Sequence, residues 1–548
     1  MVSLTLGGVR NLPKDRFGFR RTFFVAFLLL LSMEAYVNAP RLFATQKNAS
    51  SGTRSSSSSS ASSSLSSYDK KRLSGSQSQT HSKTQDICLN VYPACSSWLQ
   101  STDNVVLVLV GNELYQQLPT VGYGGIETSV DNIASALHQM KIPFIGIVPK
   151  RKLVQDLGFR ILETDAFANG IGGVKGRYID EVRTILIEEI LAVKNHLHLL
   201  SLTNKEKGIT SVKFFTDPTR KRVWRSTNPS QDVNLNPIKD DALIPSYLRI
   251  VIWGQSEWSQ NFADLSTVSV ISHHDGGGPL NNWNWGRRNV LHRFLSSDQI
   301  SQWVIPDGQP LGKNSEPKSK VLRAKVVPHG LPRTAFGMCP DKGYFLWVAS
   351  LDWGWKEKGL DIFLKMAEMR PQYKFVAYGT GKTEMAQRFM SELTDLSKTL
   401  KNFLFRGELK RDKHFAAFCG ATAFVMPTHA SIGESFGMTV IESLSKGVPV
   451  IASTNGAVPE VLGIGDDIIK MKSAGLLDSN RLALSGTSHF GVTCDGEDYA
   501  CYVKATDTFW GRKESNSKEI MIHAWNRFDG LFIVDSLLNY TLEGLLIV

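Results

Sequence analysis

The sequence predicts an α/β protein with two doubly wound domains. Its 548 residues exceed what one hydrophobic core usually serves, and an apolar fraction of 42% is ordinary for a globular protein. Between residues 104 and 148 a strand, a glycine-rich turn, a helix and a second strand follow one another, which is typical of a parallel crossover unit. From Phe345 onward, strands and helices alternate regularly.

In the first half, the apolar run Asn104–Gly111 predicts a buried strand. A helix follows the turn Val121–Glu127, because apolar residues recur at helical spacing from Val130 to Leu137. The polar stretch Asn204–Asp241 predicts a loop or an insertion. Further strands are expected at Ile142–Val148, Leu248–Trp253, Val268–Ser272 and Val326–Gly330, and a helix over Tyr178–Leu200.

The second half has the clearer pattern. Strands are expected at Phe345–Ala349, Lys374–Gly379, Ala423–Pro427 and Val448–Ser453. Helices are expected over Lys358–Arg370, Thr383–Leu400, Asp412–Cys419, Gly437–Ser445 and most of Glu519–Leu546. Ligands of doubly wound sheets bind at the carboxyl ends of the strands, so the turns that follow these strands are where a site is expected.

The N-terminus carries a targeting signal, because five basic residues between Arg10 and Arg21 precede the apolar run Phe23–Leu31. We expect residues 1–40 to be a cytosolic tail and an uncleaved signal anchor, and residues 41–85 to be a flexible, disordered Ser-rich stem. We therefore expect the folded region that follows the stem to lie in the lumen of the ER or Golgi. Two alternatives remain open. Cleavage of the signal near Val37 and Ala39 would give a secreted protein, and the Ser-rich, acid-poor segment that follows would suit a plastid-targeted one.

Charge and cysteine content limit the partners. The formal net charge is +11, but no dense basic run with interleaved aromatic residues supports nucleic-acid binding. Phosphate-bearing ligands or an anionic membrane surface fit the charge better. Cys88 and Cys95 are seven residues apart, as are Cys494 and Cys501; disulfides and ordinary thiols are both compatible with this spacing. No CxxC motif or Cys/His cluster predicts a metal site.

The segment Gly433–Glu442 carries the chemistry, since Glu434 and Glu442 flank the start of an expected helix. The free N–H groups of a first helical turn bind anions, and a diphosphate fits there. Glu434 would then accept hydrogen bonds from sugar hydroxyls, and Glu442 from ribose hydroxyls. From the residues alone, an equally open interpretation is that Glu434 caps the helix and Glu442 is a solvated helical residue.

Several motifs resemble one family. The spacing from Glu434 to Glu442, with Phe436 and Gly437, matches the pattern E-x-F-G-x-x-x-x-E of the two-domain retaining glycosyltransferases with the GT-B fold, of the glycosyltransferase family 4 or group 1 type. The resemblance spans about residues 105 to 462. Other matching segments are Gly124–Glu127, Lys358–Asp361, Tyr378–Gly381, Phe405–Gly407 and Gly447–Ala452.

The resemblance implies two Rossmann-like domains that face each other across a cleft. Residues 86–335 would form the acceptor-side domain, residues 336–515 the donor-binding domain, and residues 516–548 a C-terminal helical segment. It implies catalytic roles for Glu434 and for His274, with His273 as the alternative histidine. Implied donor-binding residues are Lys358, Gly379, Arg406, Phe436, Gly437, Met438, Thr439 and Glu442; implied acceptor-side residues are Gly124, Gly125 and Glu127.

The resemblance therefore implies transfer of a hexosyl-type sugar, with retention of configuration, from a nucleoside-diphosphate sugar to a glycan, a lipid or a small molecule. No cofactor and no metal ion are expected. One departure concerns Ser350, which stands where the family often has a cation. It keeps open a catalytically weak or inactive nucleotide-sugar-binding protein; a nucleotide-sugar epimerase of the same architecture is the other alternative.

Overall fold

The computed structural model of the chain describes residues 88, 91–101, 105–111, 125–149, 157–164, 179–191, 248–255, 257–274, 288–296, 299, 323–352, 356–429, 434–464, 487–488, 490–511 and 514–547. All of them belong to the unit Thr80–Val548. The expected signal anchor, stem and loop at residues 204–241 lie outside the described residues. Among those that are described, no helix has both the length and the apolar character needed to span a membrane.

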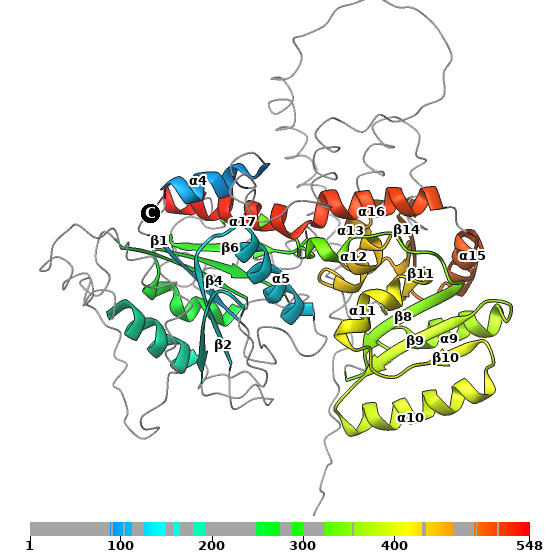
Figure 1. The fold of residues 1–548 in the computed structure, drawn as a ribbon. Coiled ribbons are helices and arrows are strands. Elements are labelled where there is room, and N and C mark those ends of the chain that lie inside the picture. The colour runs from blue at the N-terminus through cyan, green and yellow to red at the C-terminus, as the bar shows by residue number, and fades with distance from the viewer. Residues whose placement is uncertain are drawn as a thin grey trace, which may run out of the picture. The chain divides into compact units, whose positions relative to one another are not determined.

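The first of two parallel sheets has seven strands in the order β3-β2-β1-β4-β5-β6-β7 (Figure 1). The reversal of direction at β1 makes it doubly wound, as expected. Its central strands are continuous apolar runs because both faces of the sheet are covered. The strands are β1 Val105–Val110, β2 Phe144–Pro149, β3 Arg160–Thr164, β4 Arg249–Gly254, β5 Val268–Ser272, β6 Val290–Phe294 and β7 Ala324–Val326.

Alternate residues of β1 enter two different cores, because successive side chains of a strand point to opposite faces. Val105, Leu107 and Leu109 pack with α5 (Gly125–Gln139), α4 (Pro93–Ser101) and α17 (Gly530–Leu545). Val106, Val108 and Val110 pack instead with the helix over 179–191 and with the 3-10 helix η2 (Glu257–Leu265). Helices thus cover both faces of the first sheet.

The second sheet also has seven strands, in the order β10-β9-β8-β11-β12-β14-β13 (Figure 1). All neighbours pair in parallel except the short edge strand β13, which runs antiparallel to β14. The sheet is therefore doubly wound as well. Its strands are β8 Tyr344–Ser350, β9 Phe375–Thr380, β10 Phe403–Phe405, β11 Ala421–Met426, β12 Val450–Ser453, β13 Thr487–Ser488 and β14 Gly491–Cys494.

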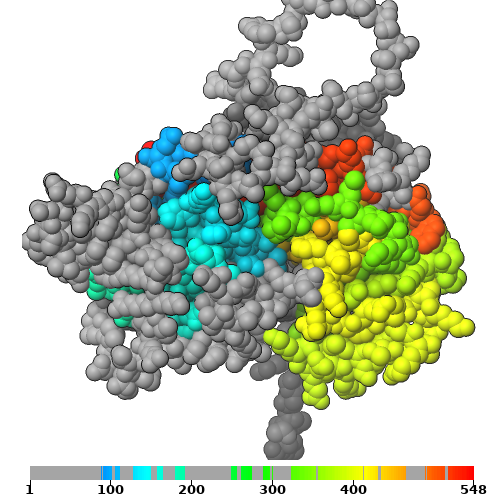
Figure 2. Space-filling view, viewed as in Figure 1, coloured from blue at the N-terminus to red at the C-terminus, as the bar shows by residue number. Residues whose placement is uncertain are grey.

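Two cores sandwich this sheet in the same way. Leu346 and Val348 of β8 face one core, and Phe345 and Trp347 face the other. Helices α11 (Arg411–Phe418), α12 (Met438–Ser445), α13 (Val458–Val461) and α16 (Glu514–Phe528) contribute to the first. Helices α9 (Leu360–Met369), α10 (Glu384–Thr399) and α15 (Tyr499–Phe509) contribute to the second. The outer face of α10 is exposed and belongs to the yellow-green surface in Figure 2.

Two expected elements differ in extent. The expected strand Val326–Gly330 ends at Val326 as β7, because Pro328 has no N–H to continue the ladder. The expected helix over Glu519–Leu546 is two helices, α16 and α17, which join at Asp529. The buried carboxylate of Asp529 caps α17 by accepting from the backbone N–H of Leu531 and also pairs with Arg333. Beside this junction, residues 331 and 529 pair in parallel in an isolated β-bridge.

All six cysteines of the sequence form disulfides. Cys88 is bonded to Cys95, and Cys494 to Cys501. For these two pairs the sequence spacing had been compatible with both disulfides and free thiols. The third, Cys339–Cys419, joins residues 80 positions apart and was not predicted, because sequence spacing cannot show that two distant segments meet. Each of these bonds restricts the unfolded chain.

Candidate functional site

Lys358 and Glu434 meet at the carboxyl ends of β8 and β11, which are neighbouring strands of the second sheet. The Lys358 ammonium lies 3.1 Å from a carboxylate oxygen of Glu434. Both side chains are about one-fifth exposed, at 22% and 21%, so the pair is shielded from bulk solvent but still accessible. Two residues predicted for the same site from separate motifs are therefore in direct contact.

The backbone around Lys358 is held tightly. Gly359 has φ +70°, and a Cβ at this position would lie 1.9 Å from the carbonyl oxygen of Pro427, so only glycine fits. The indole N–H of Trp347 donates to the carbonyl of Lys358 at 3.0 Å. The turn after β8 therefore packs directly against the turn after β11.

Glu434 is held from its other side by the turn after β12. The N–H of Ala457 donates to the Glu434 carbonyl at 2.8 Å. Gly456 makes this approach possible, because a Cβ there would lie 2.2 Å from the same carbonyl oxygen. Three strand-end turns of the second sheet thus converge on Glu434.

Helix α12 begins four residues after Glu434, with Gly437 as its N-cap and Met438 as its first residue. First-turn N–H groups have no partner within their own helix, which makes this end of α12 electropositive. Phe436 and Met438 are buried, whereas Thr439 is half-buried, with its hydroxyl 3.6 Å from the sulfur of Met426. The helix was expected to start at Gly437, and in the structure it starts one residue later, at Met438.

Glu442 lies on α12, five residues in, and its side chain is almost fully buried. One of its carboxylate oxygens lies 2.8 Å from Nε2 of His414 in α11. The structure therefore gives Glu442 an internal partner that the sequence did not indicate.

Gly379 and Arg406 lie at the ends of β9 and β10. The N–H of Gly379 donates to Gly407 at 3.0 Å, and the N–H of Arg406 donates to Ala377 at 2.9 Å. Arg406 is exposed. At the end of β8, the hydroxyl of Ser350 accepts a hydrogen bond from the N–H of Asp352 at 3.3 Å. This turn has a polar group where the family resemblance leads one to expect a cation.

His274 contacts the donor-side loop through its backbone. The hydroxyl of Ser435 donates to the carbonyl of His274 at 2.7 Å, and the hydroxyl of Ser296 donates to the carbonyl of Ser435 at 3.1 Å. The ring of His274 stacks on that of His329 at 5.1 Å, and His329 in turn meets the edge of Phe436. The structure thus brings His274 next to the segment that begins at Glu434.

The His274 ring is neutral at physiological pH. Burial lowers its pKa to about 3, with a smaller contribution from the positive charge of Arg293. Both ring nitrogens are buried and have no hydrogen-bond partner among the described residues. The alternative histidine, His273, is different, because its Nε2 lies 3.1 Å from Nδ1 of His292. His274 is therefore the member of the pair with ring nitrogens left for a ligand.

The acceptor-side glycines are only partly described. Gly124 lies outside the described residues. Gly125 is the first residue of α5, and Glu127 lies in the first turn of that helix. The described part of α5 contacts the stacked rings of His274 and His329, since the hydroxyl of Ser129 lies 2.6 Å from Nδ1 of His329.

Comparison with known proteins concerns the part of the second sheet that runs from β8 to β12. Residues 342–478 match the family "Glycosyl transferases group 1". They are a glycosyl transferases group 1 domain. This domain contains Lys358, Glu434, Glu442 and His414, and therefore most of the predicted donor site.

Curated proteins that segments of this chain resemble are named as glycosyltransferases. A segment of 108 residues is 27% identical to a sulfoquinovosyl transferase of Arabidopsis thaliana, covering 19% of each chain. A segment of 113 residues is 31% identical to a GDP-mannose-dependent phosphatidylinositol monomannoside mannosyltransferase of Corynebacterium glutamicum, covering 19% of this chain and 28% of the relative. The matches thus span less than a third of these two relatives.

Among solved structures, a sucrose-phosphate synthase from Thermosynechococcus elongatus aligns with a TM-score of 0.48 and 13% identity, over 79% of this chain and 97% of that one.

Three residues in or near the predicted donor site were not predicted from the sequence: His414, His429 and Ser435. Ser435 was within the motif, but nothing in the pattern assigned its hydroxyl a partner. His414 and His429 lie outside every motif, and isolated histidines carry no local signal. Only their contacts in the folded chain draw attention to them.

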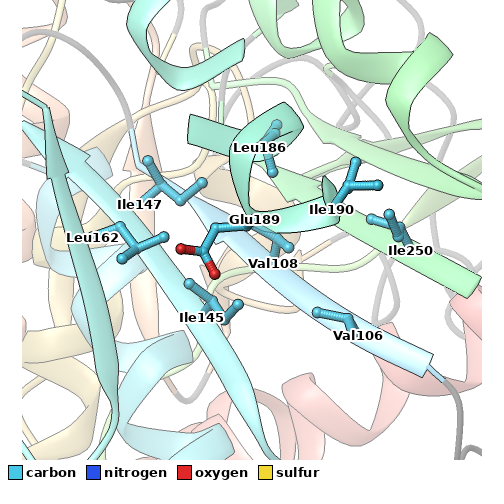
Figure 3. A pocket seen from close by; sticks show the side chains of 9 residues that line it. All are labelled: Val106, Val108, Ile145, Ile147, Leu162, Leu186, Glu189, Ile190 and Ile250. Carbon is cyan, nitrogen blue, oxygen red and sulfur yellow. The ribbon is translucent and has the colours of Figure 1, made fainter. Parts of the chain in front are cut away.

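A small cavity lies away from the group 1 domain, between the first sheet and the helix over 179–191 (Figure 3). Its volume of about 20 Å³ holds roughly one water molecule. The lining is aliphatic except for Glu189, whose carboxylate makes two hydrogen bonds to the buried guanidinium of Arg160 at 2.8 and 2.9 Å. A nucleotide does not fit there, so this cavity is not the predicted donor site.

Within the described ranges, no group of three or more His, Cys, Asp or Glu side chains is arranged to hold a metal ion.

Proposed function

We propose that the protein is a glycosyltransferase that moves a hexosyl-type sugar, with retention of configuration, from a nucleoside-diphosphate sugar to an acceptor hydroxyl. The contact between Lys358 and Glu434 carries this proposal, because it joins a cation and a hydroxyl-binding carboxylate at the tip of α12. The name of the Corynebacterium relative, a GDP-mannose-dependent enzyme, supports a nucleotide-sugar donor.

In this proposal the donor diphosphate lies against the N-terminus of α12. As the bond between sugar and phosphate breaks, the leaving diphosphate gains negative charge. The Lys358 ammonium and the first-turn N–H groups stabilise that charge, and they are most effective where the protein has already excluded water. Lys358 is positioned for this without large rearrangement, because its backbone is fixed by Trp347 and Gly359.

Glu434 would lie beside the sugar, accept hydrogen bonds from its hydroxyls and orient it for the acceptor. Glu442 would face the ribose, with His414 holding one of its oxygens. His274 would bond a sugar hydroxyl as a neutral imidazole, which satisfies ring nitrogens that otherwise lie buried without a partner among the described residues. The acceptor would approach from the side of α5.

A panel of nucleotide sugars tests the proposal. The full chain is incubated with UDP- and GDP-sugars and a mixture of glycan, lipid and small-molecule acceptors, and release of nucleoside diphosphate is measured. Glu434→Gln keeps the shape of the side chain but removes its charge, and we expect turnover to fall about 100-fold or more. Glu384→Gln, in the first turn of the exposed helix α10, is the matched control. Equal turnover by the wild type and Glu434→Gln would contradict the catalytic assignment.

A binding protein without transfer activity is the second candidate, and Ser350 favours it. With an uncharged side chain at the end of β8, less positive charge stabilises the leaving diphosphate. The two candidates differ in one observation. Nucleotide sugars raise the thermal midpoint of both, but only the transferase releases nucleoside diphosphate when acceptor is present.

We also propose that the catalytic region works in an oxidising compartment, as a lumenal domain behind the N-terminal signal. The pairing of all six cysteines supports this, because disulfides persist in secretory compartments and are rare in the cytosol. Asn539, in the sequon Asn539–Thr541, has an exposed side chain on α17. Treatment with an endoglycosidase should therefore lower the mass of the protein; an unchanged mass for wild type and Asn539→Gln alike would count against a lumenal location.

A further inference from the structure

We propose that His429 is a positioning residue for Lys358 and that it sets how strongly the site prefers a nucleoside diphosphate over a monophosphate. The inference rests on the proposed function, in which Lys358 contacts the donor diphosphate. His429 belongs to none of the family motifs, yet it contacts the segment that carries Lys358 at two points.

The first contact is made by the backbone. The N–H of His429, in the turn after β11, donates to the carbonyl of Glu357 at 3.0 Å. Glu357 directly precedes Lys358, and Gly359, which directly follows it, packs on Pro427. The turn after β11 therefore touches the chain immediately before and immediately after Lys358.

The second contact is made by the ring. Nε2 of His429 lies 3.2 and 3.3 Å from the two carboxylate oxygens of Asp361, in the first turn of α9. Asp361 is three residues after Lys358, and both partners are largely shielded, with side chains 19% and 26% exposed. A hydrogen bond to a charged carboxylate that is shielded from water is stronger than a hydrogen bond between two neutral groups in water. His429 thus fixes the start of α9 relative to β11.

A third group lies near the same ring. Nδ1 of His429 lies 3.9 Å from a carboxylate oxygen of Glu497, in the loop between β14 and α15. The disulfide Cys494–Cys501 closes this loop. The Glu497 side chain is 67% exposed, so its attraction is weak. Glu497 nevertheless provides a second carboxylate, near the ring nitrogen that does not contact Asp361.

Fixing the backbone matters because a lysine side chain is long and flexible. An ammonium that must be immobilised on binding loses part of its binding energy to that ordering, and a fixed backbone reduces the loss. Lys358 is paired with Glu434, the residue proposed to lie beside the sugar, so it faces the phosphate nearer the sugar. A nucleoside monophosphate lacks that phosphate. Loss of His429 should therefore weaken diphosphate binding selectively.

The test measures the affinities of the full chain for UDP, GDP, UMP and GMP by calorimetry. In the wild type we expect the better-bound diphosphate to bind at least about tenfold more tightly than its monophosphate. His429→Leu should reduce that ratio about tenfold and leave monophosphate affinity within about twofold. His429→Gln should recover most of the preference, because its amide N–H can donate to Asp361. His523→Leu, a half-buried ring stacked on Phe490, is the control.

Two outcomes would overturn the inference while leaving the proposed function intact. Either His429→Leu keeps the wild-type ratio, or it weakens both nucleotides equally, as a general structural defect would. If His429→Leu does not fold, Asp361→Asn removes the charge that the ring contacts; a reduced ratio in this variant supports the inference and an unchanged ratio overturns it. A wild type that binds neither UDP nor GDP refutes the proposed function itself, and the inference with it.

Discussion

The Lys358 ammonium contacts a carboxylate oxygen of Glu434 at 3.1 Å, although 76 residues separate the two in sequence. Two strand-end turns of one sheet make this contact, because the carboxyl ends of β8 and β11 lie side by side. When no ligand is present, the positive charge of Lys358 is compensated by the negative charge of Glu434. A bound diphosphate would compete for the ammonium and leave Glu434 available for hydroxyl groups.

Replacing Lys358 should weaken binding of the diphosphate. We expect Lys358→Ala to raise the dissociation constant for UDP or GDP by about 10- to 100-fold, because a charge-assisted contact to phosphate contributes on the order of 1.5–3 kcal/mol. Isothermal titration of the full chain measures this. Lys382→Ala removes an exposed lysine just before α10 and serves as the control. An affinity within twofold of the wild type would show that Lys358 does not contact the phosphates.

Removing His414 should destabilise the second sheet. In His414→Leu, the carboxylate of Glu442 stays buried but loses a hydrogen bond of 2.8 Å, so we expect a loss of about 1–3 kcal/mol in the free energy of unfolding. Thermal unfolding followed by circular dichroism measures it. His138→Leu, on the exposed face of α5, should change the midpoint little. If both variants unfold at the wild-type temperature, the His414–Glu442 contact does not stabilise the fold.

Buried histidines should make the fold acid-sensitive. Burial lowers the pKa of His292 to about 4, whereas an unfolded histidine titrates near 6.5. The unfolded state therefore binds the proton first, and the stabilisation present above pH 6.5 is lost as the pH falls towards 4, by about 1.4 kcal/mol per unit.

His292→Gln removes this contribution. Between pH 6.5 and pH 5, the variant should lose about 2 kcal/mol less stability than the wild type, as measured by denaturant unfolding. His138→Gln, at an exposed position of α5, is the matched control. Parallel pH curves for His292→Gln and the wild type would mean that His292 is accessible to protons in the folded protein.

The disulfides should differ in their contribution to stability. Cys339–Cys419 closes a segment of 80 residues, and Cys494–Cys501 closes one of seven. Because the stabilisation grows with the length of the closed segment, replacing both cysteines of the long pair by serine should cost about 2–5 kcal/mol, more than for the short pair. Thermal midpoints measure this. Thiol labelling in urea without reductant should detect no free cysteine; six labelled thiols would contradict the pairing.

Much of the fold was predictable because its signals are local. The apolar runs at β1, β8 and β11 indicate strands buried on both faces, and the helical periodicity of α5 and α10 is read within a few turns. Shorter or less apolar strands such as β3, β6 and β10 were not predicted. Each gains its stability from a neighbouring strand, which a single-segment pattern cannot reveal.

By itself the sequence determined the alternation of strands and helices, the position of Glu434 before α12, and the position of Lys358 before α9. These depend on residues within a few turns of each other. Only the tertiary structure decided that Glu442 meets His414 across 28 residues and that His429 meets Asp361 across 68. Such contacts depend on how separate helices and strand-end turns pack together, and that packing is a property of the whole core.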